Sequence, residues 1–267
     1  MSFNVCVAGA TGWAGSALSK GVHKDKALNL VSGVSRLSAG EDLSKLLNFD
    51  ANHIPVFENV DQAFKNTDCD ILVEYTDPSI AKDNVLHALE HNINVVIGTS
   101  GLTKADYQEI EEVALKQDCS VLAVGNFAIT VVLLQKFSEM AAEYLPNYEI
   151  IDYASDQKED APSGTARELA NRLAAVQKPK KSVSDKAFQG IKESRGANLE
   201  GVNIHSVRLP GYVISIESIF GATDEQLTIR HDSGSSAEPY VQGGLLAIKK
   251  VGTFKGLKRG LDSVMDL

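Results

Sequence analysis

The chain has 267 residues, of which 43% are hydrophobic and 23% are charged, and its formal net charge is −9 with an isoelectric point of about 5.2. This composition is typical of a globular protein with enough apolar material for its own core, so we expect no metal or disulfide staple. An acidic chain without a concentrated basic patch is a poor candidate for binding nucleic acid or an anionic membrane. No apolar stretch approaches the roughly 18 residues that span a bilayer.

The N-terminal segment and the cysteines indicate a cytoplasmic protein. An apolar run starts at residue 3, without the basic region and long apolar region of a signal peptide. The cysteines, Cys6, Cys69 and Cys119, are far apart in sequence and form no CxxC pair. Cys6 and Cys69 lie in apolar, strand-like segments, which predicts buried free thiols in a reducing compartment.

Strands and helices alternate in the first half of the chain. We expect strands at 3–8, 28–35, 70–75, 93–97 and 119–125. We expect helices at 16–24, 79–92 and 104–117. Short apolar runs that alternate with helices predict a parallel sheet with helices on both faces.

After about residue 128 the pattern changes to consecutive strands. Helices are expected at 130–144, 164–176 and 238–250, and strands at 147–155, 202–208, 212–220 and 226–231. Strands that follow one another across Gly and Pro predict an antiparallel or mixed sheet. The polar, lysine-rich segment 178–200 is expected to be a solvated surface loop.

A glycine-rich turn, GATGWAG, follows the first expected strand and precedes a helix. Its spacing, with Gly9, Gly12 and Gly15, is a variant of the dinucleotide-binding fingerprint. Glycines let the backbone turn tightly and approach a pyrophosphate, and the helix N-terminus offers free N–H groups and the positive end of a dipole. The residues expected to bind the cofactor here are Gly9, Ala10, Thr11, Gly12, Trp13 and Ala14.

The end of the second expected strand favours NADPH over NADH. Sites selective for NAD usually carry Asp or Glu about 20 residues after the glycines, where the carboxylate bonds the ribose 2′-hydroxyl. Here that position holds Ser35, followed by Arg36. A guanidinium offers a 2′-phosphate several donors and a positive charge. NADH use remains open, since Arg36 could instead lie on the surface or stack on adenine.

A second anion-binding pattern lies at the start of the helix expected at 164–176. Ser163, Gly164 and Thr165 can direct backbone N–H groups and hydroxyls at an anion, with the helix dipole behind them. Lys158, a few residues upstream, could neutralise a second carboxylate or donate a proton. Taken alone, a helix cap and a solvated lysine would explain the same residues.

The segment KEDAPSGTA, residues 158–166, resembles the K-x-D-A-P-S-G-T-A signature of the dihydrodipicolinate reductase family of lysine and diaminopimelate biosynthesis. Other segments resemble that family's motifs in the same order along the chain: GATGWAG at 9–15, EYTDP at 74–78, VVIGTSG at 95–101, GNFAITV at 125–131, SVRLPG at 206–211 and LTIRHDSGSSAEPYVQGGLLA at 227–247. The resemblance covers essentially the whole chain.

The resemblance implies an α/β fold, with a Rossmann-type doubly wound parallel sheet built from 1–127 plus 238–267. It also implies an inserted α+β substrate domain, 128–237, whose sheet makes a homotetramer. Lys158 would be the catalytic lysine, and the substrate carboxylates would meet the turn of Ser163, Gly164 and Thr165. The loops 98–100 and 125–127 would bracket the nicotinamide. Together with the EYTDP segment, they add these cofactor-binding residues: Thr76, Gly98, Thr99, Ser100, Gly125, Asn126 and Phe127.

The chain departs from the family where a His-His pair normally precedes the lysine, in the pattern E-x-H-H-x-x-K. The first histidine, the usual proton donor or acceptor, is here Ala154, and the second, a substrate contact, is Ser155. The family's G-E-H stretch is here residues 214–216, Ile-Ser-Ile. Protonation must then fall on Lys158 alone or on another group, for which the candidates are Tyr153, Asp156, His205 and His231.

We therefore expect an oxidoreductase that passes a hydride from NADPH to a small, cyclic, carboxylated imine, and no metal, because the cofactor carries the chemistry. Two alternatives remain: a paralogue that reduces another cyclic imine or imino acid, and an NADPH-binding regulatory protein that has lost catalysis. A semialdehyde dehydrogenase is disfavoured because no cysteine lies at a helix start. A short-chain dehydrogenase is disfavoured because Tyr153 and Lys158 do not form Tyr-x-x-x-Lys.

Overall fold

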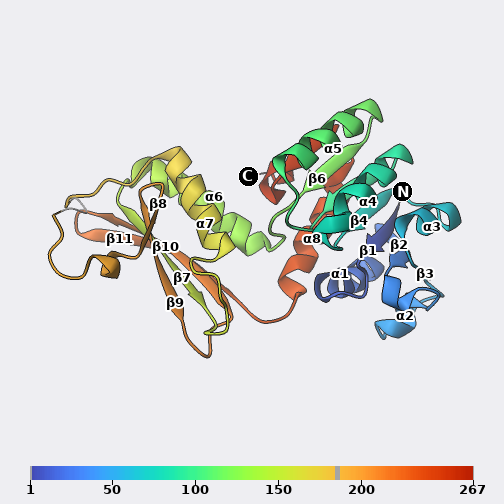
Figure 1. Cartoon of the computed structure of the whole chain (residues 1–267), viewed down its shortest axis with the longest axis horizontal. Coiled ribbons are helices and arrows are strands. Elements are labelled where there is room, and N and C mark those ends of the chain that lie inside the picture. The colour runs from blue at the N-terminus through green and yellow to red at the C-terminus, as the bar shows by residue number, and fades with distance from the viewer. Residues whose placement is uncertain (1, 184–186, 267) are drawn as a thin grey trace. The chain divides into compact units, whose positions relative to one another are not determined.

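The structure, a computed structural model, describes residues 2–183 and 187–266. The chain forms two compact units (Figure 1). The first contains Met1–Ile129 and Ala237–Leu267, and the second contains Thr130–Ser236. The second unit is therefore an insertion between the two segments of the first.

The first unit holds a parallel sheet, in the order β12-β6-β5-β4-β1-β2-β3 among the residues described. Its strands are β1 Phe3–Ala8, β2 Leu28–Val34, β3 Val56–Phe57, β4 Ile71–Glu74, β5 Asn94–Ile97, β6 Ser120–Ala123 and β12 Gly256–Arg259. Its helices are α1 Trp13–Lys24, α2 Leu43–Leu46, α3 Val60–Asn66, α4 Pro78–Glu90, α5 Lys104–Lys116 and α8 Glu238–Val251, with 3-10 turns η1 Arg36–Ser38 and η3 Leu261–Val264.

Both faces of this sheet are buried, which explains why its strands are apolar runs without alternation. Helices α3, α4 and α5 pack on one face, where Leu89 and Ile110 contact strand residues such as Leu72. Helices α1 and α8 contact each other and cover the opposite face. The predicted doubly wound parallel sheet is thus confirmed.

The second unit holds a mixed sheet in the order β11-β10-β7-β9-β8. Its strands are β7 Tyr148–Ala154, β8 Ala197–Leu199, β9 Val202–Arg208, β10 Ile214–Ala222 and β11 Glu225–Ser233, with helices α6 Ile129–Tyr144 and α7 Gly164–Val176 and the 3-10 turn η2 Lys192–Arg195. Strand β7 runs parallel to β9 and antiparallel to β10. The predicted mixed sheet in an α+β unit is confirmed.

Only one face of β7 is fully buried. Tyr148 and Ile150 pack with Leu134 of α6 and with Leu169 of α7. Alternate residues of β7 are half-buried on the opposite face, as the two-residue period of a strand requires.

Two predictions about individual segments are wrong. Segment 178–200 is not a loop throughout, because β8 within it pairs with β9; residues 184–186 of that segment lie outside the described residues. Cys69 is half-buried rather than buried, because it lies ahead of β4 and not inside it. Cys6 and Cys119 are buried, and all three thiols are free.

The described residues offer neither a membrane span nor a metal centre. None of their helices combines the length and the apolar character needed to cross a bilayer. No three His, Cys, Asp or Glu side chains among them are grouped as metal ligands would be.

Candidate functional site

The glycine-rich turn lies at the carboxyl end of β1, where the chain's path through the sheet reverses. The order places β2 and β3 on one side of β1, and β4, β5 and β6 on the other. Ligands of open α/β sheets bind at this point. Gly9 has φ +80, and a Cβ there would overlap the carbonyl oxygen of Tyr75. The turn therefore requires glycine at residue 9.

The N-terminus of α1 follows this turn and has no competing anion. Gly12 is the N-cap and provides no side-chain cap, and the first turn contains no acidic residue. The free N–H groups and the positive end of the helix dipole are thus available to a pyrophosphate. Trp13, the only tryptophan of the chain, is exposed at the first helical position, and its ring meets the edge of Tyr240 at 5.6 Å.

Thr11 and Ser35 lie together at the end of β2. Their hydroxyl oxygens are 2.8 Å apart, which ties the glycine-rich turn to the residue where an NAD site would carry a carboxylate. Arg36 follows, exposed, at the start of η1. Hydrogen bonds from Ser79, and more weakly the charge of Arg36, lower the pKa of Asp77. The guanidinium therefore lies in the neighbourhood of the N-terminus of α4.

Glu74, at the end of β4, joins two of the loops predicted to hold the cofactor. Its carboxylate is fully buried and accepts hydrogen bonds from the N–H and hydroxyl of Thr76. It also accepts from Thr99 at 3.4 Å and from Asn84 at 3.4 Å. Burial raises the pKa of Glu74, and these hydrogen bonds oppose the rise. Glu74 was not predicted as a site residue, although it opens the EYTDP segment.

The remaining predicted cofactor residues follow β5 and β6. Gly98 lies flat against the Tyr75 ring, so that a Cβ there would overlap it. Phe127 is buried with its ring 5.5 Å from that of Tyr75, and Asn126 accepts a hydrogen bond from the N–H of Ala128 at 2.9 Å. All the predicted cofactor residues thus follow strands of one sheet at their carboxyl ends, the edge where such sheets bind ligands.

In the second unit, the N-terminus of α7 is capped on one side and open on the other. The hydroxyl of Ser163 accepts from the N–H of Ala166 at 3.2 Å, and the N–H of Ser163 donates to Asp152 at 2.9 Å. The N–H groups of Gly164 and Thr165 have no backbone or side-chain acceptor within the described ranges. The open donors of this turn are therefore those of Gly164 and Thr165.

Asp152 lies beneath this turn, on β7, and is 1% exposed. Arg208, on β9, donates to Asp152 Oδ2 at 2.7 Å and to the carbonyl oxygen of Asp160 at 2.7 Å. Ser206 Oγ lies 3.4 Å from Asp152 Oδ2. Residues 152 and 208 are distant in sequence, so their spacing gave no signal; the parallel pairing of β7 with β9 brings them together.

Lys158 lies in the loop between β7 and α7. Its Nζ is 2.6 Å from Asp160 Oδ1 and its side chain is 31% exposed. The hydrogen bond and charge of Lys158 lower the pKa of Asp160. Ser155 stands at the start of the same loop, where its carbonyl accepts from the Lys158 N–H at 3.1 Å. Lys158 and Ser155 thus share one short loop that leads to the start of α7.

Of the other proton-donor candidates, Asp156 lies in the loop with Lys158, whereas the rest lie on strands. Tyr153 points to the opposite face of β7 from Asp152 and donates to Glu217 at 2.8 Å. Burial, and then this bond to Glu217, raise the pKa of Tyr153. His231 is buried on β11, and burial lowers its pKa. Near neutral pH Tyr153 therefore holds its proton and His231 is largely uncharged, so neither is a ready proton donor.

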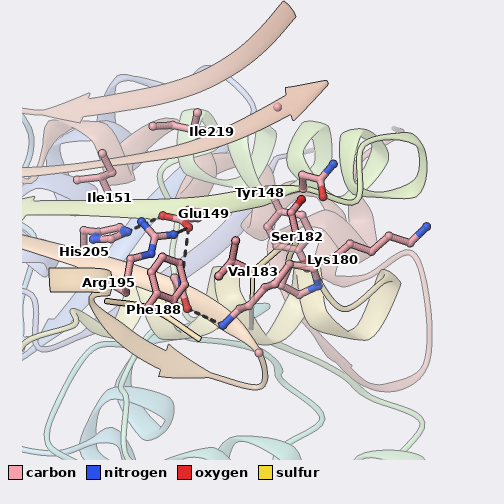
Figure 2. Close-up of a pocket in the computed structure, with 16 residues that line it drawn as sticks. Tyr148, Glu149, Ile151, Lys180, Ser182, Val183, Phe188, Arg195, His205 and Ile219 are labelled. Atoms are coloured by element: carbon pink, nitrogen blue, oxygen red, sulfur yellow. Dashed lines mark hydrogen bonds and ion pairs between the residues drawn. The ribbon is translucent and has the colours of Figure 1, made fainter. Parts of the chain in front are cut away.

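His205 belongs to a separate pocket of about 600 Å³ (Figure 2). Its Nε2 is 2.6 Å from Glu149, which also accepts from Arg195 and from Asn203. His205 precedes Arg208 by three residues on β9, a distance of roughly 10 Å along a strand. The pocket is thus distinct from the start of α7, and His205 is engaged there.

Comparisons with known proteins agree over both units. The N-terminal family of dihydrodipicolinate reductase matches residues 3–127 and the C-terminal family matches residues 130–265. The 4-hydroxy-tetrahydrodipicolinate reductase of Bacillus cytotoxicus is 35% identical over 98% of this chain and 98% of its own length. That of Listeria monocytogenes is 35% identical over 98% of this chain and 99% of its own.

Solved structures give the same result. A dipicolinate-bound dihydrodipicolinate reductase from Paenisporosarcina sp. TG-14 superposes with a TM-score of 0.89 and 32% identity, covering 99% of this chain and 100% of that one. An amine dehydrogenase from Mycobacterium smegmatis, at 13% identity, shares the fold with a TM-score of 0.69 and coverage of 100% and 97%. The chain therefore belongs to the dihydrodipicolinate reductase family, and it is an NAD(P)H-dependent oxidoreductase of lysine and diaminopimelate biosynthesis.

Proposed function

We propose that the protein uses NADPH to reduce a small cyclic imine that carries carboxylates, the reaction of a 4-hydroxy-tetrahydrodipicolinate reductase. The observation that carries this proposal is the open N-terminus of α7, where the N–H groups of Gly164 and Thr165 lie near the loop of Lys158. The names of the curated relatives support it. So does the dipicolinate, a cyclic dicarboxylate, bound to the solved relative.

The first unit would hold the cofactor, and its residues fit a dinucleotide. A Cβ at Gly9 would overlap the Tyr75 carbonyl oxygen and one at Gly15 would overlap the Gly9 carbonyl oxygen, so the tight turn depends on both glycines, and α1 begins without a side-chain cap. Bound NADPH would supply the hydride. Arg36 would pair with a 2′-phosphate, while Ser35, which has no charge, would not repel it. Thr76, Thr99 and the loop 125–127 would surround the nicotinamide.

The second unit would hold the substrate. Gly164 and Thr165 would donate their N–H groups to one carboxylate, and the hydroxyls of Ser163 and Ser155 would add donors. Lys158 would neutralise a second carboxylate and, directly or through water, provide the proton that Ala154 cannot. A paralogous substrate remains the second candidate, because Ala154 and Ser155 replace the family's histidines.

We further propose that the protein is a cytoplasmic homotetramer. The half-buried face of the mixed sheet, which carries Glu149, Ile151 and Tyr153, would form the contact between copies. Light scattering on the purified protein tests this: a mass four times 28.7 kDa is expected, and a monomer would contradict it.

The deciding experiment is an NADPH-oxidation assay with the condensation product of aspartate semialdehyde and pyruvate, generated in situ. Turnover that Lys158→Ala abolishes supports the proposed reaction. Turnover only with other cyclic imines or imino acids, tested in parallel, identifies a paralogue. Binding of NADPH without turnover of any of these substrates would indicate a regulatory protein.

A further inference from the structure

A buried carboxylate lies directly beside the turn to which we assign the substrate's own carboxylate. Asp152 Oδ2 accepts the N–H of Ser163 at 2.9 Å, and the next two N–H groups along the chain are those of Gly164 and Thr165. Asp152 is 1% exposed, so little water screens its charge. An ionised Asp152 with no counter-charge would repel any anion at this turn.

Arg208 provides that counter-charge. Its side chain is 16% exposed, and its guanidinium lies 2.7 Å from Asp152 Oδ2 and also donates to the Asp152 carbonyl at 3.3 Å. Strand register explains the position, because Arg208 pairs with Ala154 in the parallel ladder of β7 and β9. A buried acid needs both pairing and hydrogen bonds, and removing one partner leaves a charge that destabilises its surroundings.

The same guanidinium fixes the loop that carries Lys158. Arg208 NH2 donates to the carbonyl oxygen of Asp160 at 2.7 Å, and the side chain of Asp160 pairs with Lys158 at 2.6 Å. One side chain therefore links β7, the start of α7 and the lysine loop. No other arginine of the described residues contacts both Asp152 and this loop.

We propose that Arg208 is a positioning residue for substrate binding, an inference that rests on the proposed function. It cancels the charge of Asp152 next to the Gly164 and Thr165 donors, and it holds the loop of Lys158 in place. Arg208 acts through these groups and does not touch the reacting atoms. Its contribution is to make an anion site possible beside a buried carboxylate.

The test combines Arg208→Gln, Asp152→Asn and the double variant, with dipicolinate as the binding probe and the in-situ condensation product as the substrate. Arg208→Gln is expected to raise the Kd for dipicolinate and the KM for substrate by roughly tenfold or more, because it leaves Asp152 uncompensated. The double variant should bind dipicolinate and substrate nearly as well as wild type, since it removes both charges. Arg208→Lys, which keeps the positive charge, should lose less affinity than Arg208→Gln. NADPH affinity, followed by the fluorescence of Trp13, should not change in any variant.

A matched control separates this role from general stability. Arg172→Gln removes an arginine of the same unit that pairs with Glu139 on the helical side of the sheet, so it should lower the melting temperature without changing KM. The inference is overturned if the double variant binds dipicolinate as weakly as Arg208→Gln does, or if Arg208→Gln has the wild-type KM. Either result leaves the proposed function intact. Failure of the wild-type protein to bind dipicolinate and to turn over the substrate overturns both.

Discussion

Replacing Gly9 with alanine tests whether the glycine-rich turn is the cofactor site. The backbone of Gly9 has φ +80, a conformation that costs an L-residue about 1–2 kcal/mol. The added Cβ would also overlap the Tyr75 carbonyl oxygen, so the ends of β1 and β4 must move apart. We expect a total loss of about 3 kcal/mol in the free energy of unfolding. Because the turn itself is displaced, we also expect NADPH affinity to fall at least roughly tenfold.

Trp13 gives a direct assay for this prediction. It is the only tryptophan of the chain and lies at the first position of α1, so its emission should be quenched when a dinucleotide binds beside it. Gly40→Ala is the control for backbone strain, because Gly40 has φ +86 and a Cβ there would meet nothing within 4 Å. That variant should lose only about 1–2 kcal/mol of unfolding free energy, the cost of the backbone strain alone. The reasoning would be refuted if Gly9→Ala folds and its Trp13 fluorescence is quenched at the same NADPH concentration as in wild type.

Three further changes are expected to have distinct effects. Arg36→Ala should raise the KM for NADPH roughly tenfold and leave that for NADH unchanged, as parallel NADPH and NADH kinetics would show; equal effects on both would rule out a 2′-phosphate contact. Lys158→Gln should lower kcat/KM by roughly 100-fold or more without changing the Trp13 signal, and unchanged turnover would remove Lys158 from the mechanism. Burial raises the pKa of Glu74 above its usual 4.5, so the stability linked to its proton is complete below pH 4.5 and is lost as pH rises through the raised pKa. In urea titrations, the unfolding free energy of wild type should therefore fall relative to that of Glu74→Gln as the pH rises from acidic to neutral. A difference between the two proteins that does not change with pH would contradict the raised pKa.

The sequence was informative where the determining contacts are local. Gly9, Gly12 and Gly15 follow an apolar strand within a few residues, so the turn could be predicted from spacing alone. The strands β3 and β12 could not, because β3 has only two residues and β12, with the sequence Gly-Leu-Lys-Arg, is not an apolar run. Their pairing with β2 and β6 decides their conformation.

The residues that we predict to bind the substrate show the same limit. Lys158, Ser163 and Thr165 lie within one short segment, and the resemblance to a family motif predicted them as site residues. Asp152 and Arg208 became neighbours only through the register of β7 and β9, which no sequence period specifies. The importance of a buried ion pair beneath the turn could therefore be inferred only from the folded chain.

The position of the insertion has a consequence for how the protein folds during its own translation. Helix α8 and strand β12 complete the sheet and one helical layer of the first unit, yet they follow the whole of the second unit in the chain. Gly243 of α8 lies against the Phe127 carbonyl oxygen, and Tyr240 lies against Trp13. During translation, therefore, the nascent first unit stays incomplete on the ribosome while the second unit emerges with all of its own strands. The glycine-rich turn is synthesised before the second unit, and helix α8, which supports it, is synthesised after that unit.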